Sequence, residues 1–318
     1  MLRLIHLIGV LLILQLSLNA QIVNQEFDPT RITEIPQTEV KALIKIYEET
    51  NGIRWKKNNG WMHSYTPSSW YGVAVRGGHV VELEIMSNNL SGSIPDDIKH
   101  LTQLEILYLF DNNLSGNLPA GFFELKQLSR VNFWNNKLSG SLPDKFENLE
   151  NLREFVLTEN NFSGQIPESI TKLKKLEGLT LSQNNFSGQI PATINQNLNL
   201  KWFSLSDNDL TGPIPSTLTQ VKTLRWVALA NNSLSGNFPA DIHLLKELTY
   251  FDISNNEIEG TIPRKITELT KLSMFNISNN RITGTIPVEL RQMKSMQRLV
   301  TSGNLIQGEI NLDDFPVE

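Results

Sequence analysis

The chain has 318 residues, of which 40% are hydrophobic, and it carries a formal net charge of −5. Nucleic acids and anionic membranes attract basic proteins, so this acidic balance argues against both as partners. The chain contains no cysteine, which excludes a fold held together by disulfides. Metal-ligand spacings, a nucleophile elbow and a phosphate-binding loop are not recognisable. The sequence therefore predicts no enzyme, no cofactor and no metal site.

Residues 1–20 have the pattern of a secretory signal peptide. Arg3 precedes an apolar run from Leu4 to Leu16, and Ala20 before Gln21 suits cleavage. The apolar run is short for a membrane span. We therefore expect a secreted or cell-surface protein whose mature chain has no stable membrane span.

Residues 21–79 predict an N-terminal cap. A helix is expected from about Thr38 to a stop at Asn51-Gly52, because apolar residues recur at helical spacing at Val40, Leu43, Ile44 and Tyr47. Three large aromatic residues follow at Trp55, Trp61 and Trp70. In a cap without disulfides, we expect these side chains to cover the open end of the first repeat.

A 24-residue unit is repeated ten times between residues 80 and 310. Its frame is L-x-x-L-x-L-x-x-N-x-L, and its asparagine returns without insertion or deletion at Asn88, Asn112, Asn136, Asn160, Asn184, Asn208, Asn232, Asn256, Asn280 and Asn304. This period predicts an α/β repeat solenoid of stacked parallel strands, with about 4.8 Å between strands. Residues 311–318 remain as a C-terminal tail.

Each position of the repeat has a predicted role. Alternating apolar residues such as Leu107 and Leu109 mark a strand with one buried face. The asparagine amides are expected to bond to backbone groups of adjacent turns, and the apolar residues after each proline predict 3₁₀ turns on the outer wall. The pattern is broken at Asn197, where we expect Leu198 to move inward instead.

The words L-S-G-x-I-P, as in Leu90 to Pro95 and Leu138 to Pro143, carry a family resemblance. The chain resembles plant-type leucine-rich-repeat proteins, which include secreted polygalacturonase inhibitors and receptor-like-kinase ectodomains. The resemblance covers about residues 40–310 and implies a right-handed superhelix with a parallel concave sheet. Ser68 and Val75 stand where plant members have capping cysteines, so the chain is cysteine-free as in bacterial members.

Two groups of aromatic residues are predicted on the outward, concave side of the strands. The first group is Tyr108, Phe110 and Trp134, and the second is Trp202, Trp226 and Tyr250. Large exposed aromatics usually mark an interface, so we expect them to bind a protein, peptide or glycan partner. Small residues between the groups leave room for that partner: Gly178, Ser182, Ser204, Ala228 and Ala230. The opposing interpretation is that these rings only stiffen the sheet.

Two other functions are weighed. Serines recur from Ser182 to Ser302, interrupted only by Ala230, and such an array of hydroxyls suits a structural protein that binds ice or crystalline polysaccharide. Glu82 and Glu84 form a carboxylate pair that a glycoside hydrolase would need. Nothing near that pair predicts a cleft, and recognition through the concave face is favoured over both.

Overall fold

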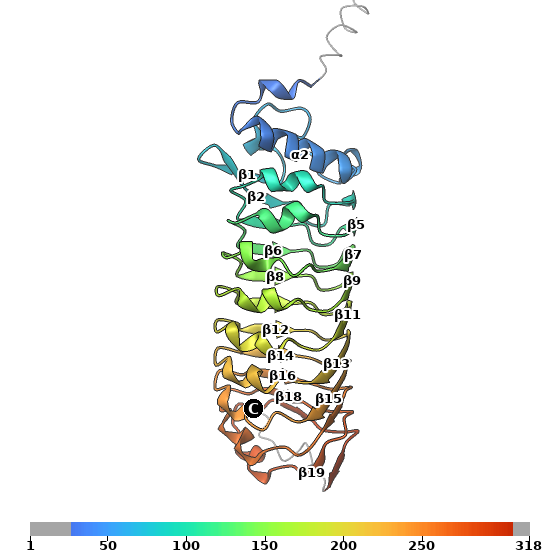
Figure 1. Ribbon diagram of the computed structural model, residues 1–318, viewed down its shortest axis with the longest axis vertical. Helices are drawn as coiled ribbons and strands as arrows, with labels where there is room; N and C mark the ends of the chain where they lie inside the picture. Colours follow the sequence, from blue (N-terminus) through green and yellow to red (C-terminus); the bar gives the residue numbers. More distant parts are fainter. Residues whose placement is uncertain (1–26, 308–318) are drawn as a thin grey trace, which may run out of the picture.

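The computed structural model describes residues 27–307 of the protein, so the predicted signal peptide and C-terminal tail lie outside the described residues. Within this part, the chain forms one long stack of similar turns (Figure 1). The helix α2 (Gln37–Glu49) lies at its N-terminal end, with three short 3₁₀ helices around it: η1 (Pro29–Arg31), η2 (Gly52–Arg54) and η3 (Pro67–Ser69).

The long sheet has eleven strands in the described residues. Its first two strands pair antiparallel and the rest pair parallel with their neighbours. In spatial order they are β1 (Val73–Arg76), β2 (His79–Glu84), β4 (Ile106–Tyr108), β6 (Arg130–Asn132), β8 (Glu154–Val156), β10 (Gly178–Thr180), β12 (Trp202–Ser204), β14 (Trp226–Ala228), β16 (Tyr250–Asp252), β18 (Met274–Asn276) and β20 (Arg298–Val300). Each repeat supplies one strand, in a register that never slips, so the predicted solenoid is confirmed.

A second parallel sheet runs beside the first along the stack (Figure 1). Its strands are β3 (Ser91–Gly92), β5 (Asn113–Gly116), β7 (Lys137–Ser141), β9 (Asn161–Gly164), β11 (Asn185–Gly188), β13 (Asp209–Pro213), β15 (Ser233–Asn237) and β17 (Glu257–Glu259). A separate pair is formed by β19 (Thr283–Thr285) and β21 (Leu305–Gln307). These strands come from the L-S-G words, whose glycines adopt positive φ, for example 78° at Gly116.

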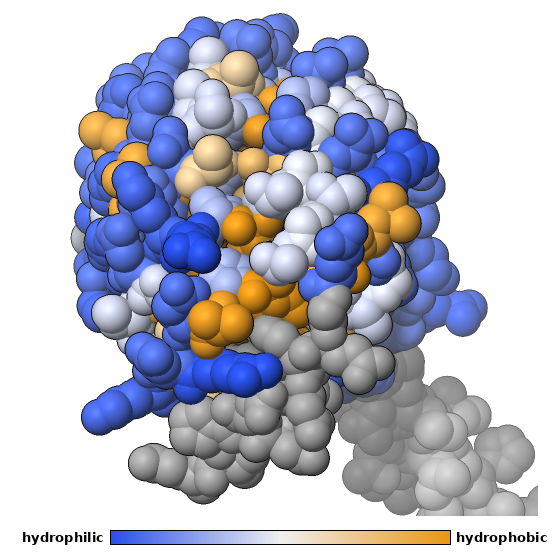
Figure 2. All heavy atoms as spheres, turned by 90° about the horizontal axis from the view of Figure 1, so that it is seen from below, coloured by the Kyte–Doolittle hydropathy of each residue, from blue (hydrophilic) through white to orange (hydrophobic). Residues whose placement is uncertain are grey.

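The outer wall is built of 3₁₀ helices, as the apolar spacing predicted. They are η4 (Asp96–His100), η5 (Ala120–Glu124), η6 (Phe146–Asn148), η7 (Glu168–Lys172), η8 (Ala192–Gln196), η9 (Ser216–Gln220), η10 (Ile242–Leu244), η11 (Arg264–Glu268) and η12 (Val288–Gln292). Their apolar side chains and those of the strands fill one continuous core. Seen from the C-terminal end, hydrophilic residues lie around the circumference and hydrophobic residues toward the middle (Figure 2).

The repeated asparagines form a ladder of buried amides. Nδ2 of Asn112 donates to the carbonyls of Ile85 at 2.8 Å and Leu109 at 2.9 Å, and its Oδ1 accepts the N–H of Leu90 at 2.9 Å. The same pattern recurs through Asn280. Each amide therefore bonds to its own turn and to the preceding turn, which confirms the predicted role.

The cap packs as the sequence predicts, with a small difference in the helix. Trp55, Trp61 and Trp70 are 5%, 0% and 2% exposed, and ring centroids lie 5.0 Å apart for the first pair and 4.9 Å for the second. The helix begins one residue before the predicted Thr38, and Ile46 takes a buried position while Ile44 remains partly exposed. Since the indoles fill the end of the stack, the cap needs no disulfide.

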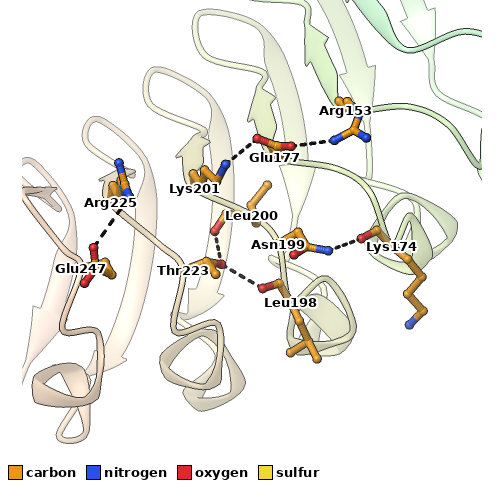
Figure 3. Close-up of polar contacts among 10 residues, drawn as sticks. All are labelled: Arg153, Lys174, Glu177, Leu198, Asn199, Leu200, Lys201, Thr223, Arg225 and Glu247. Atoms are coloured by element: carbon orange, nitrogen blue, oxygen red, sulfur yellow. Dashed lines mark hydrogen bonds and ion pairs between the residues drawn. The ribbon is translucent and has the colours of Figure 1, made fainter.

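The expectation for Leu198 is wrong. Asn197 itself occupies the core position with no exposed surface, while Leu198 is 61% exposed and points outward (Figure 3). The backbone keeps the register of the other repeats: the N–H of Asn197 donates to the carbonyl of Ile194 at 3.1 Å, as that of Val221 does to Leu218 one repeat later. The carbonyls of Leu198 and Leu200 lie 2.9 and 2.7 Å from the hydroxyl of Thr223. The regular turn therefore places residue 197 in the core position and residue 198 outside.

Candidate functional site

The outward side chains of the long sheet form the concave face, and its largest aromatic residues are exposed. Trp134, Trp202 and Trp226 keep 38%, 46% and 40% of their surface accessible, whereas the alternate residues of the same strands, such as Phe203 and Val227, are buried. The period-two alternation of a strand produces this separation. The indoles thus lie outside the core, as the sequence predicts.

The first aromatic group lies together on the strands near the cap. The ring of Phe110 is 6.4 Å from that of Tyr108 and 6.2 Å from that of Trp134, both in tilted geometry. Burial, and secondarily the charge of Glu154, raises the pKa of Tyr108 above its ordinary value. The three rings form one contiguous cluster.

The second aromatic group is split. The rings of Trp226 and Tyr250 stack face to face with centroids 3.5 Å apart and 2° between their planes. Trp202, the third member of this group, does not continue the stack. A Cβ placed on Gly178 would lie 3.7 Å from Cε3 of Trp202, so that indole lies over the glycine of strand β10. The missing side chain at Gly178 makes room for Trp202 to turn away from Trp226.

A hollow of about 700 Å³ lies in the concave face between the two aromatic groups. Its lining comes from strands β6 to β14 and the residues next to them: Arg130, Arg153, Glu154, Val156, Thr158, Glu177, Gly178, Thr180, Ser182, Trp202, Ser204 and Trp226. We call this feature the central hollow. Of the six predicted site residues, it contains Trp202 and Trp226, and the other four lie outside its lining.

Charged side chains form an ordered edge along the central hollow. Glu177 lies between Arg153 and Lys201, with oxygen–nitrogen distances of 2.9 and 2.6 Å (Figure 3). The hydrogen bond from Lys201, together with the nearby positive charges, lowers the pKa of Glu177. Sequence reasoning missed these three residues because they precede the outward columns. Their alternating charge at 24-residue spacing was the signal that could have found them.

A buried carboxylate, that of Asp252, contacts Tyr250 of the stacked pair. Asp252, 9% exposed, accepts the N–H of Ser254 at 2.9 Å and the hydroxyl of Tyr250 at 3.3 Å. Burial raises the pKa of the Tyr250 phenol above its ordinary value, and the negative charge of Asp252 raises it further. The aspartate thus fixes Tyr250, which in turn covers one face of Trp226.

The serine column does not form an exposed array of hydroxyls. Ser182, Ser254 and Ser278 are 8%, 4% and 7% exposed. Their hydroxyls bond to neighbours within the protein, to Ser204, Asp252 and Asn276 respectively. Neighbouring side chains on the concave face therefore engage these three serines, which do not form a continuous exposed array of hydroxyls.

The carboxylate pair that the sequence suggested and the possible metal ligands remain to be located. Glu82 lies 3.6 Å from Arg76, in an ion pair at the end of the sheet. Within residues 27–307, His, Cys, Asp and Glu side chains do not gather in groups that would hold a metal ion. No helix in the same part of the chain has the length and apolar character to span a bilayer.

The described residues define a repeat solenoid with an open concave face. Models of the leucine-rich repeat match residues 79–101, 103–125, 126–186, 199–221 and 246–306, which together make up more than half of the chain. The chain belongs to the leucine-rich-repeat family.

Solved structures give the same fold. The ectodomain of the Arabidopsis receptor kinase HAESA, solved with the peptide hormone IDA, is 34% identical over 71% of this chain, with a TM-score of 0.65. A leucine-rich-repeat protein of Leptospira interrogans is 34% identical over 71% of this chain, with a TM-score of 0.60. This chain spans only 37% of the HAESA chain and 55% of the Leptospira chain.

A plant ice-binding protein is similar over a larger share of both chains. It covers 87% of this chain and 97% of its own, with a TM-score of 0.70 and 24% identity. At this identity the likeness concerns the fold alone. Among curated proteins, no significant match was found.

Proposed function

We propose that this protein is a recognition protein without catalytic activity, and that it binds a macromolecular partner through its concave face outside the cytoplasm. The observation that carries the proposal is the central hollow, whose end is walled by the exposed indoles of Trp202 and Trp226. Exposed indoles beside a depression are typical of the residues that dominate binding energy. The proposed partner is a protein, a peptide or a glycan.

Similar structures support a location outside the cytoplasm and binding of a partner. The ectodomain of a plant receptor kinase is among them, and two others are plant receptors solved with their ligands, HAESA with the peptide hormone IDA and the peptide hormone receptor RGFR1 with RGF2. The apolar run at Leu4 to Leu16 is the basis in the sequence for export. A repeat solenoid whose outward columns vary while its core stays constant serves recognition rather than catalysis.

The test compares the purified wild-type chain with a Trp202→Ala/Trp226→Ala double variant on an array that carries peptides and glycans. We expect the wild type to bind a defined set of probes and the double variant to bind them about 30-fold more weakly or not at all. Leu198→Ala, which removes an exposed apolar side chain from the outer wall, should bind like the wild type.

Thermal unfolding of the same proteins separates recognition from sheet stiffening. If the indoles serve a partner, the double variant melts close to the wild type. A double variant that retains binding, or that melts far below the wild type, would support stiffening of the sheet instead.

A further inference from the structure

We propose that the central hollow binds a neutral oligosaccharide chain. This inference rests on the proposed function, because it names the chemical class of the partner for the same face. It is carried by three features that occur together: a free indole face, hydroxyl groups on the floor, and lining side chains whose formal charges sum to zero.

The free face of Trp226 points into the central hollow. Tyr250, on the following strand, covers the opposite face at 3.5 Å, so the uncovered face is directed toward strand β12 and the hollow that Trp226 lines. A flat face fixed by stacking on one side is suited to the C–H face of a sugar ring on the other. The ring is already ordered, so little side-chain entropy is lost on binding.

Hydroxyl side chains form part of the floor of the central hollow, beside Val156 and Gly178. Thr158, Thr180 and Ser204 are partly exposed there, whereas Ser182 is 8% exposed and its hydroxyl lies 2.7 Å from that of Ser204. A hydroxyl both donates and accepts, and its hydrogen rotates to suit the partner. Such groups match sugar hydroxyls, which also donate and accept.

The charged side chains that line the central hollow are balanced in sign. The lining contains two arginines and two glutamates, and Arg153 lies 2.9 Å from Glu177 in a direct ion pair. Lys201 at the edge, 2.6 Å from Glu177, adds one positive charge, so neither sign of charge dominates strongly. The planar guanidinium and carboxylate groups can each bond to two adjacent sugar hydroxyls.

An extended peptide is less well matched to the same surface. The strands under the central hollow use their backbone groups in the parallel sheet, as the pairings of β10 with β8 and β12 show. Addition of a peptide strand needs a free sheet edge, and this floor is not an edge. The lining also contains no asparagine or glutamine side chain to pair with a peptide backbone.

The aromatic groups suggest how a longer chain would run. Trp134 follows strand β6 and Trp202 begins strand β12, so three strand-to-strand spacings separate them across the sheet. Along the strand direction, Trp134 lies four residues beyond the position that is equivalent to Trp202. With about 4.8 Å per strand and 3.3 Å per residue, their backbones are roughly 19 Å apart. A chain that contacts both groups would cross the central hollow diagonally.

The experiment titrates the full chain with a panel of neutral hexasaccharides made of β-1,4-glucan, β-1,3-glucan, β-1,4-xylan and β-1,4-linked N-acetylglucosamine. Tryptophan fluorescence and calorimetry report binding. A galacturonate hexamer and a mixed hexapeptide pool are the charged-glycan and peptide arms. We expect one or more neutral hexasaccharides to bind, with an affinity that changes less than about twofold between about 0.05 and 0.5 M NaCl.

Gly178 offers a variant that leaves every aromatic ring in place, and Leu198→Ala on the outer wall is its control. Leu198 is 61% exposed and lies outside the lining of the central hollow, so Leu198→Ala should bind within about twofold of the wild type. Gly178→Gln places a long side chain in the central hollow and should weaken hexasaccharide binding about tenfold or more.

The outcomes separate the two proposals. If the peptide pool or the galacturonate hexamer binds and no neutral hexasaccharide does, the neutral-glycan inference is wrong and recognition by the concave face stands. If hexasaccharide binding is unchanged in Gly178→Gln, the sugar binds elsewhere and the inference also fails. If no probe in any arm binds, both the inference and the proposed function lose their support.

Discussion

The indole of Trp226 and the phenol of Tyr250 lie parallel at 3.5 Å, on neighbouring strands of the concave face. Aromatic pairs usually adopt offset or edge-to-face geometry with centroids about 4.5–7 Å apart. Face-to-face rings with centroids 3.5 Å apart are consistent with a backbone register that holds Trp226 directly opposite Tyr250. Asp252 contributes to this order because its carboxylate accepts the Tyr250 hydroxyl. The stack both stiffens the sheet locally and presents one ordered face of Trp226.

The first prediction concerns Tyr250. Tyr250→Ala removes the support of Trp226, and we expect partner binding to weaken about tenfold, with a stability loss of about 1 kcal/mol from the lost pair. Fluorescence anisotropy should show a more mobile indole. Tyr250→Phe keeps the stack and serves as the control, and equal losses of binding in both variants would show that the hydroxyl matters more than the stack.

The second prediction concerns Asn197. This side chain has no exposed surface, and neither its Nδ2 nor its Oδ1 has a hydrogen-bond partner within the described structure. A buried amide left unpaired costs about 1–3 kcal/mol. Asn197→Leu should therefore raise the free energy of unfolding by about that amount, which urea denaturation would measure. A decrease would indicate that the amide has a partner outside the protein.

The third prediction uses an asparagine of the ladder as the contrast. Nδ2 of Asn160 donates to the carbonyls of Phe133 at 2.9 Å and Leu157 at 3.0 Å, and its Oδ1 accepts the N–H of Leu138 at 3.0 Å. Asn160→Leu leaves these buried groups unpaired, so we expect a loss of about 3 kcal/mol or more. Equal effects at Asn160 and Asn197 would contradict the structural difference between them.

Repeat period and alternation were sufficient to predict most of the fold. The 24-residue spacing fixes which residues are buried, since one frame applies ten times and the strands stack in the same register. The aromatic residues of the concave face follow from the same alternation. Asn197 departs from the frame only in its side chain: its backbone makes the same turn as the other repeats, so residue 197 is buried and Leu198 is exposed.

The candidate site was predicted less completely, because side-chain direction within the outward columns is set by neighbours. The indole of Trp202 lies over Gly178 of strand β10, and the sequence marks position 178 only as a small residue. The charged edge formed by Arg153, Glu177 and Lys201 needs three side chains from separate repeats to meet. Spacing alone brings such residues near one another without showing which pairs form.

The fourth prediction concerns the join between cap and sheet. Glu39 is 2% exposed, and its carboxylate lies 2.6 Å from Nδ1 of His79 and accepts the N–H of Val80 at 2.8 Å. Glu39→Ala leaves the Val80 N–H buried without a partner, and we expect a loss of about 1–3 kcal/mol. Limited proteolysis should then cut first in the cap. His79→Ala is the milder change, since the bond from Val80 remains, and a larger loss in that variant would show that the imidazole is the main contact.

The fifth prediction concerns stability in acid. The pKa of Glu177 is lowered in the folded protein, chiefly by the hydrogen bond from Lys201, below its ordinary value of 4.5. The folded state thus binds this proton more weakly than the unfolded state does. The resulting stabilisation is complete above the unfolded pKa and is lost as the pH falls through the folded pKa. Glu177→Gln should therefore be less stable than the wild type near pH 7, and the difference should shrink below about pH 4.

Urea denaturation of both proteins between about pH 7 and pH 3 measures this difference directly. Glu247→Gln provides a matched comparison, because the hydrogen bond from Lys271 chiefly lowers the pKa of Glu247 as well, but at a site outside the lining of the central hollow. Both variants should show the same sign of pH dependence. Of these two variants, only Glu177→Gln should also alter ligand binding, since Glu177 lines the central hollow and Glu247 does not. A constant stability difference across the pH range would mean that the ion pair does not shift the titration of Glu177, and the charged edge would then act in binding alone.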